Sequence, residues 1–355
     1  MALATLLKRK SQDTVIAGGG AAALVGLLAP GWTDAVHEQA AAALGILCAS
    51  NAQNDDSVRE CGGVAALVGL LAPGGSAAVH EQAASVLKSL CADNAQNKDS
   101  VRECGGVAAL VVLLAPGVSA GVQTQAAKAL ENMCLKNAQN CNSARECGGI
   151  AALVRLLAPG GSAAVQGAAA GVLRSLCVSN TQNRDSAREC GGVAALVGLL
   201  APGGSAALQE RAAWALRNLC GSNAQNVVCV RWCGGVAPLV GLLAPGSPAA
   251  VHEQAAAALW SVCFNNNENK DSVRECGGVA ALVGLLAPAC PAGVHHMAAG
   301  ALAMMTSESG LCREAVRACG AVAALQRVLA CASSAAAHQR AAAVLRDLGH
   351  APQGA

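Results

Sequence analysis

Apolar residues recur at helical spacing along the whole chain, in blocks separated by glycine and proline. One block, about ten residues long, carries Val193, Leu196, Val197, Leu199 and Leu200, the spacing of one helix face. Pro202-Gly203-Gly204 ends that block, and a longer helix is expected from the cap Ser205 to about Cys220. The polar stretch before the first block predicts a short helix from Arg184 to Cys190, with Asn183 as its N-cap.

This group of three predicted helices repeats with a fixed period. The first glycine of each copy lies 43 residues after the previous one, at Gly19, Gly62, Gly105, Gly148, Gly191, Gly234, Gly277 and Gly320. A period of this size without insertions is typical of a solenoid of stacked helical units. We therefore predict an all-α fold of about eight three-helix repeats. Residues 1–18 are expected to form an N-terminal capping half-repeat, 19–348 the solenoid, and 349–355 a short tail.

The repeat resembles the armadillo repeat. The similarity is carried by Asp185-Ser186-Ala187-Arg188-Glu189-Cys190-Gly191-Gly192-Val193, then Leu196-Val197 and Leu199-Leu200, then Ala212-Ala213-Trp214-Ala215-Leu216-Arg217-Asn218-Leu219. It extends over nearly the whole chain. The resemblance implies a right-handed superhelix in which the third helices line a concave groove that binds extended segments of other proteins.

Composition and charge exclude several classes of function. The net charge is +2, and the one short basic run is Lys8-Arg9-Lys10, so a clustered basic face for nucleic acid is not expected. Apolar windows such as 61–79 are interrupted by glycine and proline and are too short to span a membrane. Basic residues follow the apolar ones in Met1–Lys10, the reverse of a secretory signal. We expect a monomer in the cytosol, with the nucleus as the alternative.

Thirteen of the eighteen cysteines lie in two columns of the repeat. One column closes the third helices: Cys48, Cys91, Cys134, Cys177, Cys220 and Cys263. The other precedes the Gly-Gly turn: Cys61, Cys104, Cys147, Cys190, Cys233, Cys276 and Cys319. Because free cysteine packs as a small apolar residue, we predict that both columns are buried, reduced thiols. A metal site built on the i, i+4 pair Cys229 and Cys233 is the weaker alternative.

No pattern in the chain supports catalysis. Gly18-x-Gly20-x-x-Ala23 lacks the preceding strand of a dinucleotide site. The histidines of one column (His37, His80, His252, His295 and His338) are a repeat apart and cannot converge on one metal. We predict no enzyme activity, no cofactor and no metal. An arginine ladder on the first helices is expected to form i, i+3 pairs with Asp56, Asp99, Asp185 and Asp271.

Polar residues share one face of consecutive third helices and are the predicted peptide-binding groove. They are Gln82, Lys88, Gln125, Lys128, Asn132, Arg174, Arg211, Trp214, Arg217, Asn218, Gln254 and Trp260. Asn132 and Asn218 are expected to bond a ligand backbone, and Trp214 to form a wall for a large side chain. Arg174, Arg211 and Arg217 favour acidic or phosphorylated segments, and Glu131 limits that preference.

These observations predict a non-catalytic scaffold or adaptor that holds an extended segment of a partner protein. One alternative is a nuclear-import cargo receptor, although only Trp214 and Asn218 reproduce the Trp–Asn pair that the resemblance associates with that role. Another is the substrate-binding subunit of a ubiquitin ligase complex, which would need a catalytic partner chain. The chain is also similar to vacuole-anchored armadillo proteins, but residue 2 is alanine and cannot be myristoylated.

Overall fold

The computed structural model describes residues 11–49, 51–330 and 334–350. The chain divides into two compact units, one of residues 1–156 with 160–176 and one of 157–159 with 177–355. Of the predicted N-terminal half-repeat, residues 11–17 are helical and residues 1–10 lie outside the described part. Of the predicted tail, residues 351–355 also lie outside it.

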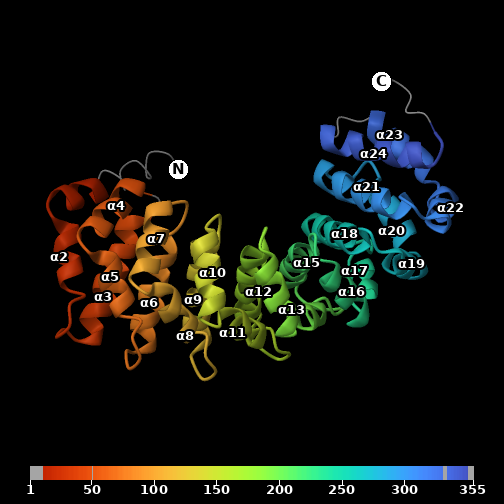
Figure 1. Ribbon diagram of the computed structural model, residues 1–355. Helices are drawn as coiled ribbons and strands as arrows, with labels where there is room; N and C mark the ends of the chain where they lie inside the picture. Colours follow the sequence, from red (N-terminus) through yellow and green to blue (C-terminus); the bar gives the residue numbers. More distant parts are fainter. Residues whose placement is uncertain (1–10, 50, 331–333, 351–355) are drawn as a thin grey trace. The chain divides into compact units, whose positions relative to one another are not determined.

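Helices recur in groups of three with the 43-residue period, and none of the described residues forms a β-strand (Figure 1). The first helices are α4 (Ala52–Glu60), α7 (Ala95–Glu103), α10 (Ala138–Glu146), α13 (Thr181–Glu189), α16 (Ala224–Trp232), α19 (Asn267–Glu275) and α22 (Gly310–Ala318). The second are α2 (Gly20–Gly26), α5 (Gly63–Gly69), α8 (Gly106–Val112), α11 (Gly149–Leu156), α14 (Gly192–Gly198), α17 (Val236–Gly241), α20 (Gly278–Gly284) and α23 (Ala321–Ala330). The third are α3 (Asp34–Cys48), α6 (Ala77–Leu90), α9 (Ala120–Cys134), α12 (Ala163–Cys177), α15 (Ala206–Cys220), α18 (Ala249–Cys263), α21 (Ala292–Thr306) and α24 (Ala335–Asp347).

The Gly-Gly pair makes the sharp corner between a first and a second helix, as predicted. Gly105 adopts the left-handed conformation, with φ of 78°, which a side chain would disfavour. A Cβ on the next residue, Gly106, would lie 2.4 Å from the Val101 side chain and 2.8 Å from its carbonyl oxygen. In this repeat, glycine at both positions lets the second helix pack this closely against the first.

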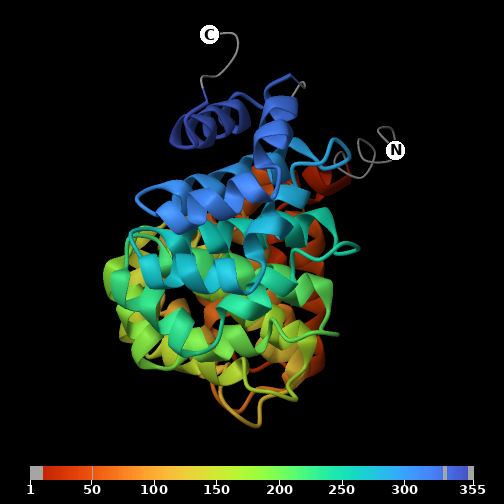
Figure 2. The same cartoon turned by 90° about the vertical axis from the view of Figure 1, so that its right-hand side faces the viewer.

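The third helices form the inner layer of each unit. In the first unit α3, α6 and α9 pack in sequence, and in the second α15, α18, α21 and α24 do the same (Figures 1 and 2). Their shared core is aliphatic, with Leu87, Leu130 and Leu259 fully buried. Buried alanines such as Ala126 and Ala127 let neighbouring helices approach closely. No helix among the described residues combines the length and the apolar character that crossing a bilayer requires.

The cap of the first helices is three residues earlier than predicted. Asn180 is the N-cap of α13, and its side chain accepts a hydrogen bond of 3.0 Å from the backbone N–H of Asn183. The helix therefore begins at Thr181, and the expectation that Asn183 caps a helix starting at Arg184 was wrong. Asn183 is instead fully buried inside the repeat.

Buried asparagines at this position tie each repeat to the one before it. The Asn140 amide donates to the carbonyl oxygen of Met133, in the third helix just before it, at 3.1 Å. The same amide donates to the carbonyl oxygen of Lys98, in the previous repeat's first helix, at 3.2 Å. Asn226 and Asn269 make the two equivalent contacts in the second unit. We call these residues, with Asn54, Asn97 and Asn183, the asparagine ladder.

The asparagine ladder predicts a large cost for a small change. Asn140→Ala leaves the buried carbonyl of Met133 without its donor, at a cost of about 1–3 kcal/mol, and also removes the bond to the carbonyl of Lys98, worth about 1 kcal/mol. We expect the free energy of unfolding of the variant, measured by urea denaturation, to fall by about 2–4 kcal/mol. Gln139→Ala is the matched control, because Gln139 is exposed in the same helix turn. Equal stabilities of the two variants would contradict the role given to the ladder.

A second column of side chains closes the C-terminal ends of the third helices. The ammonium group of Lys98 donates to the carbonyl oxygen of Leu135 at 2.6 Å, and that of Lys270 to the carbonyl oxygen of Ser307 at 2.7 Å. Arg184 and Arg313 instead donate to the last carbonyl of the third helix just before them, that of Cys177 and of Thr306. Cations are favourable at this end of a helix, where unbonded carbonyls carry partial negative charge.

Asp55 occupies the same column with the opposite charge. Its carboxylate is 6% exposed, and one of its oxygens has no hydrogen-bond partner. Burial raises the pKa of Asp55 from 3.8 to about 6, the Cys48 thiol opposes this rise, and the charge of Asp56 adds to it. The folded chain therefore holds a proton here between about pH 4 and 6 that the unfolded chain releases.

This shift predicts a pH-dependent gain from Asp55→Asn. Because the folded-state pKa is raised, the cost of the buried carboxylate is present above about pH 6 and disappears as the pH falls towards 4. At pH 7.5 we expect the free energy of unfolding of the variant to exceed that of the parent by on the order of 1–3 kcal/mol. At pH 4 the two should be alike. Denaturant melts at both pH values test this, and a gain of the same size at pH 4 would contradict it.

The two cysteine columns differ in exposure. The column that closes the third helices is buried, as predicted, and burial raises the pKa of Cys91, Cys220 and Cys263 to about 12. The column before the Gly-Gly turn was wrongly predicted to be buried. Six of its members are exposed, and Cys233 is half-buried. Cysteines of this column, such as Cys104, are the C-caps of the first helices, beside a left-handed glycine at the surface.

The arginine ladder of the first helices forms the predicted ion pairs. The four i, i+3 pairs are Arg59–Asp56, Arg102–Asp99, Arg188–Asp185 and Arg274–Asp271, with nitrogen–oxygen distances of 3.2, 3.7, 3.8 and 3.6 Å. The aspartates are also bonded between repeats, since the Asn94 amide donates to the Asp56 carboxylate. This face of the first helices is therefore mostly polar and charge-balanced.

Candidate functional site

The predicted groove residues divide evenly between the two units. Gln82, Lys88, Gln125, Lys128, Asn132 and Arg174 belong to the first unit, and Arg211, Trp214, Arg217, Asn218, Gln254 and Trp260 to the second. Within each unit the stacking of the third helices brings these side chains to one face. We describe the two sets separately, as the first-unit face and the second-unit face.

The first-unit face is organised by contacts between α6 and α9. The Lys88 ammonium lies 3.4 Å from the Gln125 amide oxygen and 3.5 Å from the Ser85 hydroxyl. The Asn132 amide donates to the carbonyl oxygen of Lys88 at 2.9 Å. That carbonyl lies in the last turn of α6, where no helical N–H follows to bond it. Asn132 is thus fixed by the neighbouring repeat, and its amide oxygen is the acceptor left for a ligand.

Lys88 and Lys128 place two positive charges together on this face. Burial lowers the pKa of Lys88, and the charge of Lys128 lowers it further. Lys88 is half-buried and Lys128 is exposed. Among the described residues, neither ammonium group forms an ion pair with a carboxylate. An anionic group bound between them would relieve their repulsion.

Glu131 is neutralised by the next repeat. Its carboxylate pairs with the Arg174 guanidinium at 2.7 Å, with both side chains about four-fifths buried. Gly171 gives this pair its space, because a Cβ there would lie 2.7 Å from a Glu131 carboxylate oxygen. The expected effects of Arg174 and Glu131 on a ligand therefore cancel, and Lys88 and Lys128 dominate the charge of the first-unit face.

The second-unit face is centred on Trp260. Its ring lies under the Arg340 guanidinium, 4.4 Å from the ring centroid, and meets the His296 ring edge-on at 5.9 Å. Gly300 makes room for it, since a Cβ there would lie 2.6 Å from the indole. Burial lowers the pKa of His296, and the charges of Arg340 and Arg217 lower it further. Arg217 and Arg340 therefore bring positive charge close to this ring pair, and Glu253 opposes it.

The remaining predicted residues differ in how much surface they offer a ligand. Arg211 is exposed, while Trp214, Arg217 and Asn218 are half-buried. Gln254 is only 8% exposed, so little of it is open to a ligand. In the first unit, Gln82 is half-buried on α6.

Two contributors to the second-unit face were missing from the predicted set. Arg340 lies in the same sequence column as Gln254, two repeats later, so its position on the third-helix face was readable from the period. His296 occupies a position where most other copies carry Glu or Gln, and its contact with Trp260 depends on Gly300. The sequence signal was Arg340 on the third helix two repeats after that of Trp260, with Gly300 on the third helix between the two.

The histidine column contacts the ends of the second helices. The rings of His80 and His252 bond the carbonyl oxygens of Ala72 and Ala244, at the ends of their second helices. Across residues 11–49, 51–330 and 334–350, no three His, Cys, Asp or Glu side chains are grouped to hold a metal ion. The histidines therefore act within the repeat, as helix–loop contacts.

Comparison with known proteins identifies the repeat. The family model of armadillo/beta-catenin-like repeats matches residues 94–135, 137–178 and 180–221, each span running from a first to a third helix. Residues 94–221 of the chain are armadillo repeats. No curated protein matches it.

Solved structures share the armadillo architecture. An engineered protein is 28% identical with a TM-score of 0.87, and the match covers 96% of this chain and 80% of that one. A designed armadillo repeat protein in complex with the peptide (KR)4 is 25% identical with a TM-score of 0.62, covering 68% of this chain and 99% of that one. Another designed armadillo repeat protein, 24% identical with a TM-score of 0.62, shows the same fold. The family model names a repeat and no enzyme.

Proposed function

We propose that this armadillo-repeat protein is a non-catalytic scaffold whose third-helix face binds an extended, acidic segment of a partner protein. The observation that carries the proposal is the Lys88–Lys128 pair, two like charges on adjacent third helices with no carboxylate partner among the described residues. Asn132 and Gln125 flank the pair with amide groups. Such groups supply the donors and acceptors that an extended backbone needs.

The spacing of the helices suits an extended chain. Packed helices lie about 8–10 Å apart, and an extended chain advances about 3.3 Å per residue. Each repeat would therefore meet two to three ligand residues, and an octapeptide would cover about three repeats of the first unit. Fixed contacts such as the Asn132 bond hold the face in one arrangement, so less ordering has to occur on binding.

The charge argues against basic cargo as the ligand. A designed armadillo repeat protein of related structure is complexed with (KR)4, but here a basic peptide would meet Lys88 and Lys128. A receptor for basic nuclear-import cargo is therefore the less favoured alternative. A role as the substrate-binding subunit of a ubiquitin ligase stays compatible with the acidic-segment proposal, since it differs in the partner rather than in the face.

The proposal predicts opposite behaviour of two peptides. A fluorescein-labelled (Glu-Gly)4 peptide should bind the full chain at low salt, measured by fluorescence anisotropy, and (KR)4 should bind at least tenfold more weakly. Lys88→Gln with Lys128→Gln should weaken the acidic peptide about tenfold, because two charge contacts of up to about 1 kcal/mol each are lost.

The control variant has the same net charge as the lysine double variant, but its two changes are at exposed residues outside the third helices. Lys136→Gln with Arg155→Gln removes the same two charges, from the loop after α9 and from α11. It should leave the affinity within about twofold of the parent. Equal losses in both double variants would show that only net charge matters and would overturn the proposal, as would tighter binding of (KR)4.

A further inference from the structure

One first helix departs from the others on its solvent face. Where α7 has Asp99, Ser100 and Glu103, α16 has Val228, Cys229 and Trp232. The three positions lie at i, i+1 and i+4, so they share one side of the helix. Trp232 is 76% exposed, although tryptophan is usually well covered in folded proteins.

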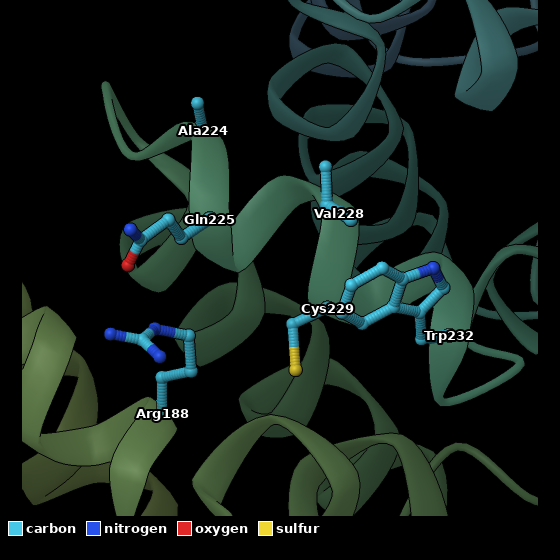
Figure 3. A pocket seen from close by; sticks show the side chains of 6 residues that line it. All are labelled: Arg188, Ala224, Gln225, Val228, Cys229 and Trp232. Atoms are coloured by element: carbon cyan, nitrogen blue, oxygen red, sulfur yellow. The ribbon is translucent and has the colours of Figure 1, made fainter.

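A cavity lies beside this apolar side, between α13 and α16. It has a volume of about 520 Å³ and is lined by Arg188, Ala224, Gln225, Val228, Cys229 and Trp232 (Figure 3). Known small-molecule and side-chain pockets have volumes of about 300–1,000 Å³. None of the six residues belongs to a third helix, so this cavity itself is not part of the third-helix faces described above.

The charges around the cavity are already balanced. Arg188 lies 3.8 Å from Asp185 and 3.4 Å from Glu189. On α16 itself, Arg231 pairs with Glu268 of α19. The cavity therefore offers no net charge to attract an ionic group, and its chemistry favours an uncharged apolar side chain.

Two smaller cavities adjoin the first one in a row. A cavity of about 330 Å³ shares Ala224 and Val228 with the first and extends to Phe264. Another, of about 160 Å³, shares Phe264 and extends to Trp260, where it meets the second-unit face. The three cavities form a narrow strip, which we call the aromatic strip. Four of the five aromatic residues of the chain lie between positions 214 and 264, so an aromatic surface of this kind occurs at this one place in the repeats.

We propose that the aromatic strip is a second docking site, for an extended peptide segment with an uncharged aromatic or large aliphatic side chain. That side chain enters the cavity beside Trp232, and the neighbouring residues of the segment pass over Phe264. A row of adjoining cavities fits the successive side chains of an extended segment better than it fits a flat folded surface.

The size of the surface argues against a second copy of this chain as the occupant. A stable protein–protein interface buries about 1,200–2,000 Å² in total. The large apolar side chains that α16 and its neighbouring loop expose are Trp232 and Phe264, and a fully buried aromatic side chain contributes about 150–250 Å². An anchored peptide segment needs only such a small apolar centre.

The test restores the residues of the other copies. The variant Val228→Asp, Cys229→Ser, Trp232→Glu gives α16 the solvent face of α7, so it should fold with unchanged circular dichroism. The probes are dodecapeptides selected from a displayed random library on the full parent chain, then labelled and titrated by fluorescence anisotropy. We expect a class rich in Trp, Phe or Leu whose affinity falls at least tenfold in this variant.

The control separates this site from the lysine pair of the first-unit face. The same peptides should bind the Lys88→Gln, Lys128→Gln variant as they bind the parent. The proposal is overturned if no selected peptide responds to the α16 variant, or if every peptide responds only to the lysine variant. It is also overturned if the parent dimerises in sedimentation velocity and the α16 variant does not, because the occupant is then a second copy. If only the acidic peptide fails to bind, the proposed function is wrong and the proposal for the aromatic strip is unaffected.

Discussion

The asparagine ladder is the constraint on which the arrangement of this armadillo-repeat protein depends. One buried amide, as at Asn140, bonds a carbonyl in the third helix just before it and a carbonyl in the first helix of the previous repeat. Both bonds can form only in one register, because a shift of either helix would break a bond that the buried amide makes. The amide oxygen of Asn140 has no hydrogen-bond partner, so the residue carries a cost as well. Asn140 therefore does more to select one stacking register of the repeats than to add net stability.

A fixed register lets side chains 43 residues apart act as neighbours. Glu131 and Arg174 meet because the repeats are stacked without slippage, and Gly171 leaves the space they need. Trp260 and Arg340 meet across two repeats because Gly300 leaves a gap between them. The third-helix faces are therefore built from contacts between repeats, and their charge depends on which cations those contacts neutralise. Arg174 is neutralised, and Lys88 with Lys128 is not.

The sequence predicted the elements that depend on local pattern and missed those that depend on packing. The third helix from Ser205 to Cys220 and the Gly-Gly corners follow from periodicity and glycine chemistry. The first-helix cap could not be decided locally, because Asn180 and Asn183 are both good caps and only burial distinguishes them. The second cysteine column was misjudged because a C-cap beside a surface turn and a core position look alike in sequence. The groove columns were readable, but the Glu131–Arg174 pairing and the orientation of the Asn132 amide are fixed by the neighbouring repeat.

The most direct measurement of the central claim is the pKa of Lys88 with and without an acidic ligand. Burial and Lys128 hold this pKa below its ordinary value in the free protein. Carbon-13 NMR titration of the labelled lysine side chains, assigned with Lys88→Gln, follows it directly. If a (Glu-Gly)4 peptide binds between the two ammonium groups, the pKa of Lys88 must rise at saturation, because a nearby anion favours the charged form. An unchanged Lys88 pKa in the presence of bound peptide would place the ligand elsewhere and contradict the account.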